Sequence, residues 1–250
     1  DTPESGTKLA TRYSGEYIRF GTGENNLYQI VSHETEGTTK ITSAIPLKSS
    51  GSYKTIQFDN GSSSTAIKDF SNSIYRKMSN YENYIAAPEV GGIGTGNPIY
   101  SSSNTIGAFL NREYLTSGSY LTTDQVNMIE DNTTWYLGTV GFGTSYKLAK
   151  YTSATSTNLT STTTTAKVGL LRLGELNSGQ FDKAVNNTDY WTLTPYNKPY
   201  VHCVYNTGNA NRYDVKYSRG ARPTINLKSN VVIISGDGTK DNPFEVKLAS

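Results

Sequence analysis

The chain has very little cysteine and histidine. Its 250 residues include one cysteine, Cys203, and two histidines, His33 and His202. A single cysteine excludes an intrachain disulfide, and no spacing of His and Cys residues is typical of a metal site. The histidines lie far apart, so a catalytic triad would need partners that only folding brings together. We therefore expect no enzymatic activity, no metal and no cofactor.

Charge of one sign is also lacking. Lys and Arg total 23 against 21 Asp and Glu, a formal net charge of +2, and the basic residues are scattered. This pattern argues against a nucleic-acid partner, which would require a concentrated basic face. No apolar run is long enough to cross a bilayer, so membrane insertion is not expected.

Residues 1–6 are polar and turn-like, and no signal peptide is visible, as expected of a mature start. Ser, Thr, Gly, Asn and Tyr are abundant, whereas charged residues make up only 18% of the chain. This composition favours an exported, extracellular protein on a bacterial cell surface.

Short strands are expected at the start of the chain. Residues 17–20 and 27–32 flank the turn signal at 21–26 and predict a hairpin, and residues 38–45 predict a third strand. Helices follow. Apolar residues recur at helical spacing over 65–84 and again over 106–114. Thr122 and its neighbours offer an N-cap for a third helix that reaches Ile129.

Strands return in the second half of the chain. They are expected over residues 135–140, as a central strand at 167–173, over 221–227, and as a closing hairpin of residues 231–235 and 244–248. The Ser/Thr-rich stretch 151–165 predicts an exposed loop. Strands, then helices, then strands indicate an α+β fold. We expect a tether of little structure at residues 1–12, a single domain at 13–248, and a tail or cloning remnant at 249–250.

Tyrosine and asparagine are concentrated between Tyr190 and Leu227. Tyrosine gives contact area at low entropic cost, and asparagine gives adaptable hydrogen bonds, a composition typical of recognition surfaces. The candidate ligand-binding residues are Tyr196, Asn197, Tyr200, His202, Tyr205, Asn206, Asn209, Asn211, Tyr213, Asp214 and Tyr217. The alternative is plain architecture, since one ring face can pack while the hydroxyl stays wet.

Several segments carry a resemblance to known proteins. They are residues 28–31, 132–138, 168–176, 191–196, 220–229 and 235–244, in that order. The chain resembles Gram-positive bacterial surface domains with a C-type-lectin-like fold, in the variant shared with formylglycine-generating enzymes and with retroelement-diversified ligand-binding proteins. The resemblance implies an antiparallel α+β fold, and a ligand surface of exposed positions between the Trp191 segment and the Arg222–Pro223 segment.

The chain departs from two branches of that family. Formylglycine-generating enzymes need two working cysteines, and calcium-dependent sugar binders use a Trp-Asn-Asp segment that is absent here. The expectation is therefore a non-enzymatic adhesion domain that binds a protein or glycan on a host or neighbouring cell through the tyrosine- and asparagine-rich segments, which are expected to form loops. The alternative is a structural subunit or tip protein of a pilus or surface filament, in which the tyrosine-rich face contacts another subunit.

Four smaller expectations concern single residues and a turn. Trp191 is expected in the core. Arg222 is expected to be structural, with its guanidinium on backbone carbonyls or a carboxylate. Glu175 is expected to pair with Arg222 or to cap a helix. Residues 236–242 are expected to form a hairpin turn with Asx-type hydrogen bonds rather than a calcium loop.

Overall fold

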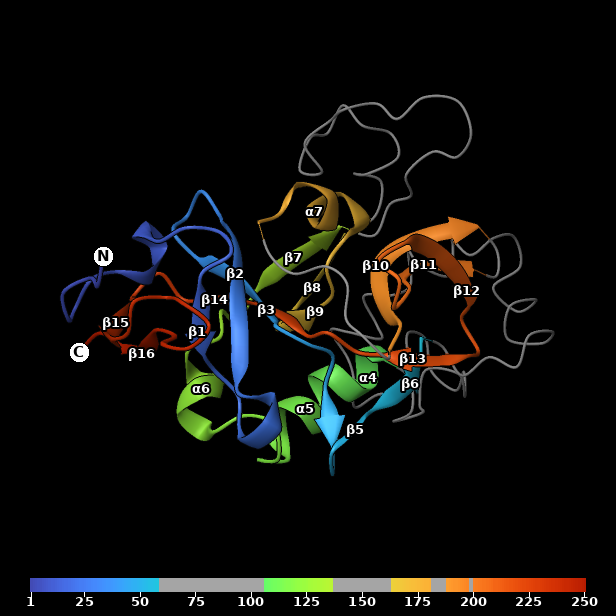
Figure 1. Ribbon diagram of the computed structural model, residues 1–250, viewed down its shortest axis with the longest axis horizontal. Coiled ribbons are helices and arrows are strands. Elements are labelled where there is room, and N and C mark those ends of the chain that lie inside the picture. The colour runs from blue at the N-terminus through green and yellow to red at the C-terminus, as the bar shows by residue number, and fades with distance from the viewer. Residues whose placement is uncertain (59–105, 137–162, 181–187, 198–199) are drawn as a thin grey trace.

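The computed structural model describes residues 1–58, 106–136, 163–180, 188–197 and 200–250 (Figure 1). The predicted helix at 65–84 lies outside these residues. The described residues form a mixed α+β fold of mostly antiparallel sheets with a few short helices. This coarse fold class was predicted from the sequence.

The first sheet has five strands in the order β1-β2-β3-β14-β9. The predicted N-terminal hairpin is formed by β1 (Tyr17–Arg19) and β2 (Leu27–His33), and β3 (Thr39–Ser43) pairs with β2. The late strand β14 (Thr224–Leu227) lies between β3 and β9 (Val168–Gly169). All five β3 residues and all four β14 residues are buried, so this part of the sheet is covered on both faces.

The second sheet also has five strands, in the order β12-β11-β10-β13-β6. Antiparallel pairs join β10 (Tyr190–Asn197), β11 (Tyr200–Val204) and β12 (Ala210–Asp214). On the other side, β13 (Ser218–Gly220) runs parallel to β10 and pairs with β6 (Thr55–Gln57). The second sheet therefore contains much of the tyrosine-rich stretch.

Four short helices are described. α4 (Ile106–Asn111), α5 (Glu113–Thr116) and α6 (Thr123–Asn127) lie together below the first sheet in Figure 1, and α7 (Leu173–Ser178) follows β9. The Thr122 side chain caps α6 by accepting from the Gln125 amide, as the sequence predicted. In α7, Glu175 accepts a hydrogen bond from the Arg172 backbone amide, which confirms its predicted capping role.

Three two-stranded pairs complete the strands: β4 (Lys48–Ser49) with β5 (Ser52–Tyr53), β7 (Thr133–Tyr136) with β8 (Thr163–Ala166), and β15 (Val231–Ser235) with β16 (Glu245–Leu248). The β15–β16 pair is the predicted closing hairpin. Two short 3₁₀ helices, η1 (Leu9–Thr11) and η2 (Gly23–Asn25), lie near the N-terminus.

Arg222 connects the two sheets, and Trp191 connects β10 to β6 within the second sheet. The Arg222 guanidinium is buried and donates to the carbonyl oxygens of Ser43 and Ala44 and to the Tyr190 hydroxyl. Trp191 is buried, and its indole N–H donates to the Ile56 carbonyl. Both predicted roles are confirmed, because a buried guanidinium and a buried indole must each find acceptors.

Residues 1–12 differ from the expected tether. The Gly6 amide donates to the Ile233 carbonyl, and the Ile233 amide donates to the Thr7 carbonyl. Leu9 is buried, only 1% exposed. The expectation rested on polar residues at 1–7, whose backbone nevertheless pairs with a distant strand.

Three further expectations are corrected. Residues 163–165, assigned to an exposed loop, belong to strand β8, which pairs with β7. The segment 167–173 contains only a two-residue strand at the sheet edge, because the chain turns into α7 at Leu173. The tyrosine-rich segment, expected to form loops, is largely strands β11 to β13.

Candidate ligand-binding surface

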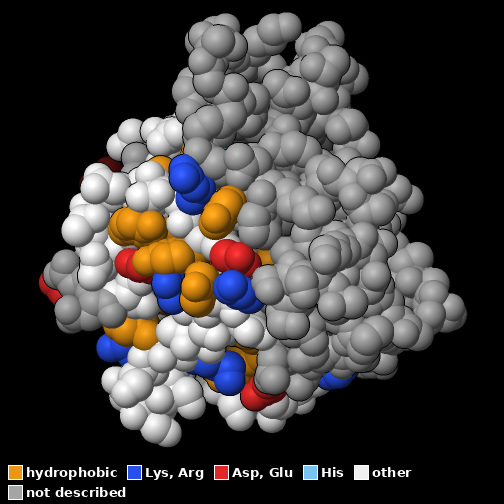
Figure 2. Space-filling model, turned by 90° about the vertical axis from the view of Figure 1, so that its right-hand side faces the viewer, with side chains coloured by type: hydrophobic (Ala, Val, Ile, Leu, Met, Phe, Trp, Pro, Cys, Tyr) orange, Lys and Arg blue, Asp and Glu red, His pale blue; other side chains and the backbone are white. Residues whose placement is uncertain are grey.

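The predicted ligand-binding residues come together on the β11–β12 hairpin and its neighbours. This end of the molecule lies at the right of Figure 1 and faces the viewer in Figure 2, where orange side chains gather beside Lys/Arg and Asp/Glu side chains. The hairpin is closed at residues 205–209, where the Tyr205 amide donates to the Asn209 carbonyl and the Gly208 amide to the Tyr205 carbonyl. Gly208 has φ of +89°, a conformation that glycine adopts without strain.

Three tyrosine rings and one guanidinium pack against one another on this face. The Tyr205 and Tyr213 rings are 5.2 Å apart between centroids, and the Tyr213 and Tyr217 rings are 6.4 Å apart. The Arg219 guanidinium carbon lies 3.5 Å from the centroid of Tyr213 and 5.7 Å from that of Tyr217. Such stacking holds each ring in place through its neighbour. We call Tyr205, Tyr213, Tyr217 and Arg219 the tyrosine platform.

Asp189, just before β10, anchors the platform from below. Its carboxylate accepts hydrogen bonds from the Tyr213 hydroxyl at 3.0 Å and from the backbone N–H of Asn206 at 2.8 Å. It also lies 3.9 Å from Nε of Arg219. One carboxylate thus orients a ring, a turn and a cation, which favours a rigid surface.

The candidate residues differ in exposure. Asn206, Asn209, Asn211 and Tyr217 are exposed, and Tyr217 is 49% exposed, among the largest values for a hydrophobic side chain in the described residues. Tyr200, Tyr205 and Tyr213 are half-buried. His202 and Asp214 are buried, and the side chains of Tyr196 and Asn197 lie outside the described part of the structure.

His202 and Asp214 were predicted to bind a ligand, but both side chains are buried in the hairpin and do not reach its exposed face. His202 lies in β11 between Val201 and Cys203, and burial lowers the pKa of its imidazole. Asp214 ends β12, and its carboxylate accepts from the Lys216 amide at 3.1 Å. Both residues therefore act as supports of the hairpin in this structure, behind the exposed amides and rings.

Arg219 of the platform and two residues beside it, Asp189 and Arg212, were not among the residues predicted from the sequence. The Arg212 guanidinium lies over the Tyr200 ring, 5.5 Å from its centroid. Rings and amides are typical of recognition surfaces, whereas a charged side chain in the same stretch carries no such signal. A signal was nevertheless present in their positions, because Arg212 adjoins Tyr213 and Arg219 lies two residues after Tyr217.

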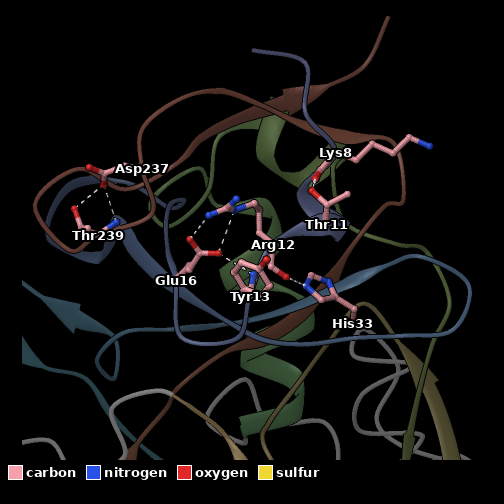
Figure 3. Close-up of polar contacts among 8 residues, drawn as sticks. All are labelled: Lys8, Thr11, Arg12, Tyr13, Glu16, His33, Asp237 and Thr239. Atoms are coloured by element: carbon pink, nitrogen blue, oxygen red, sulfur yellow. Dashed lines mark hydrogen bonds and ion pairs between the residues drawn. The ribbon is translucent and has the colours of Figure 1, made fainter. Parts of the chain in front are cut away.

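His33 lies elsewhere, at the end of β2. Its ring nitrogens contact the Thr39 hydroxyl, at 2.9 Å, and the Arg12 carbonyl, with Arg12 in turn paired with Glu16 (Figure 3). The same view shows the predicted Asx-type turn, in which Asp237 accepts from the Thr239 amide and hydroxyl. No cluster of three or more metal-ligating side chains occurs among the described residues.

A separate hollow of about 470 Å³ lies between β1, α6 and the closing hairpin. Its lining includes Arg19, Asp124 and Glu245 and none of the candidate residues.

No known protein family, curated protein or solved structure matches the chain. Within the described residues, no helix has the length and apolar character needed to cross a membrane.

Proposed function

We propose that this chain is a non-enzymatic, surface-displayed recognition domain with a C-type-lectin-like fold, and that it binds a protein or glycan through the tyrosine platform. The observation that supports this is the rigid stack of Tyr205, Tyr213 and Tyr217 with Arg219, flanked by exposed Asn206 and Asn209. A buried cluster of rings stabilises a fold, whereas a half-exposed cluster beside exposed asparagines favours contact with a partner.

The chemistry of the platform suits both ligand classes. Ring faces can stack on the apolar face of a sugar or on an apolar side chain, and the amides and Arg219 supply hydrogen bonds. Because Asp189 fixes the Tyr213 hydroxyl, little side-chain freedom is lost on binding. The proposed site is extracellular and requires no cofactor.

The test is a glycan and host-protein array probed with the native domain and with Tyr217→Ala. Tyr217 is exposed and lies on the platform, so we expect at least a tenfold loss of affinity for the captured ligand, on the order of 1.4 kcal/mol or more. The matched control is Tyr13→Ala, because Tyr13 is 70% exposed and lies by η1, away from the second sheet.

Equal binding by the native domain and Tyr217→Ala would place the ligand surface elsewhere. Loss of binding in the Tyr13→Ala variant alone would do the same. If the native domain captures nothing but self-associates, and Tyr217→Ala abolishes that association in analytical ultracentrifugation, the platform is a subunit contact of a filament instead.

A further inference from the structure

A buried lysine of the first sheet and a buried glutamate of α7 form an ion pair. Lys40 of β3 places Nζ 3.0 Å from Oε2 of Glu175 in α7, and each side chain is 5% exposed. Nζ also lies 3.5 Å from Oε1 of Glu34 and 5.5 Å from the centroid of the Trp135 ring. Burying two charges has a high desolvation cost, so a buried pair of this kind is a candidate functional site.

A carboxamide stands directly opposite this lysine. Asn226 of β14 is the cross-strand partner of Lys40 in the antiparallel ladder. Opposed residues in such a ladder project from the same face, with Cβ atoms about 5 Å apart. Asn226 is buried, and its Oδ1 accepts no hydrogen bond from the described residues. A buried carbonyl without a donor is unusual and requires an explanation.

The three groups make up the reactants and the proton carrier of an amide exchange. Lysine supplies a nucleophilic amine, asparagine an electrophilic carboxamide, and glutamate a general base and acid. The Glu175 carboxylate is held in place, since its Oε1 accepts from the Arg172 amide at 3.0 Å while Oε2 contacts Nζ. Cross-strand pairing supplies the proximity that such a reaction needs.

We propose that Lys40 and Asn226 join in an intramolecular isopeptide bond, with Glu175 as the proton carrier. Glu175 takes a proton from the Lys40 ammonium group, and the free amine attacks Cγ of Asn226. The bond from Cγ to the amide nitrogen then breaks as Glu175 returns the proton to that nitrogen. The former Lys40 nitrogen gives its second proton to Glu175, which passes it to the released ammonia, so that the leaving group departs as ammonium. The C–N bond formed replaces the C–N bond lost, so no oxidant, reductant or further reactant is needed.

The bond would link β3 to β14 covalently across the centre of the first sheet. It would close a loop containing most of the chain, and cross-links that close long loops restrict the unfolded state strongly. This proposal rests on Lys40, Glu175 and Asn226 and stands independently of the tyrosine platform.

The first test is the intact mass of the purified native chain. We expect a mass about 17 Da below the sequence mass, equal to one lost ammonia. Because a succinimide at any asparagine gives the same loss, tryptic peptides must be sequenced by tandem mass spectrometry. A branched peptide that joins Lys40 to Asn226 supports the proposal. A full mass, or separate unmodified peptides containing Lys40 and Asn226, overturns it.

Three variants assign the roles. Lys40→Arg retains the cation but removes the nucleophile, and Glu175→Gln retains the acceptor for the Arg172 amide but removes the base. Both should have the full sequence mass, and the control Asn206→Ala should retain the 17 Da loss beyond its own substitution. If Lys40→Arg does not fold, the mass of the native chain still shows whether the bond forms, and the mass of Glu175→Gln shows whether Glu175 is needed for it. A branched peptide in Glu175→Gln would remove Glu175 from the mechanism.

Discussion

The residues of β11 are more buried than the composition of the surrounding sequence indicates. The tyrosines and asparagines of this stretch suggested loops, yet Val201, His202, Cys203 and Val204 are all buried. Successive side chains of a strand point to opposite faces, so burial of four residues in a row means that β11 is covered on both faces. Val and Cys within the stretch were the strand signal, since β-branched and apolar residues favour a covered strand.

Cys203 gives a prediction that follows from this burial. Desolvation raises the pKa of its thiol to about 12. The thiolate is the reactive form, so at pH 8 only on the order of one thiol in ten thousand is reactive. We expect iodoacetamide at pH 8 to leave native Cys203 almost unlabelled for an hour, and to label it fully in guanidinium chloride.

Mass spectrometry of the alkylated protein gives the labelled fraction under both conditions. Reactivity should increase as the pH rises toward 12, provided the chain remains folded. Rapid labelling of the native protein at pH 8 would mean that the β11 strand opens, and that the hairpin beneath the tyrosine platform is not rigid.

At the scale of elements, local signals predicted the structure well and long-range pairing could not be predicted. The β1–β2 and β15–β16 hairpins and the α6 cap depend on residues close together in sequence. The placement of β14 between β3 and β9, and the parallel pairing of β13 with β10, depend on contacts between distant segments. The spacing of apolar residues along one sequence does not indicate which distant strands pair. The segment containing β9 was therefore predicted as a central strand, although it lies at the edge of the sheet.

The α6 cap offers a measurable test of a local signal. Thr122 accepts from the Gln125 amide at 3.2 Å, while the Gln125 side chain accepts from the Thr122 amide at 3.0 Å. Thr122→Ala removes one half of this capping box, and we expect it to lower the free energy of unfolding by about 1 kcal/mol.

Urea denaturation followed by circular dichroism measures this loss. The matched control is Thr123→Ala, because Thr123 is an exposed neighbour in the first turn, and its change should stay within about 0.5 kcal/mol. Equal losses in both variants would show that threonine content, rather than the capping bond, stabilises α6.

At the scale of the whole molecule, both ends of the described chain meet on one strand. Gly6 and Thr7 pair with Ile233 of β15, and the Ala249 amide donates to the Asn230 carbonyl just before β15. The N and C labels accordingly lie at the same end of Figure 1, opposite β11 and β12. A domain attached at this end would present the tyrosine platform outward, which is consistent with display on a surface.

The contribution of residues 1–12 to the stability of the domain can be measured at Leu9. Leu9 is buried in the same core cluster as Ile233 and Phe244, so Leu9→Ala should leave a cavity and lower the free energy of unfolding by about 2–4 kcal/mol. Lys8→Ala, at an exposed neighbouring position, should change it by less than about 0.5 kcal/mol. Urea denaturation of the two variants distinguishes the cases. If Leu9→Ala is as stable as the native chain, residues 1–12 do not stabilise the domain, and the tether that the sequence alone predicted is the better description.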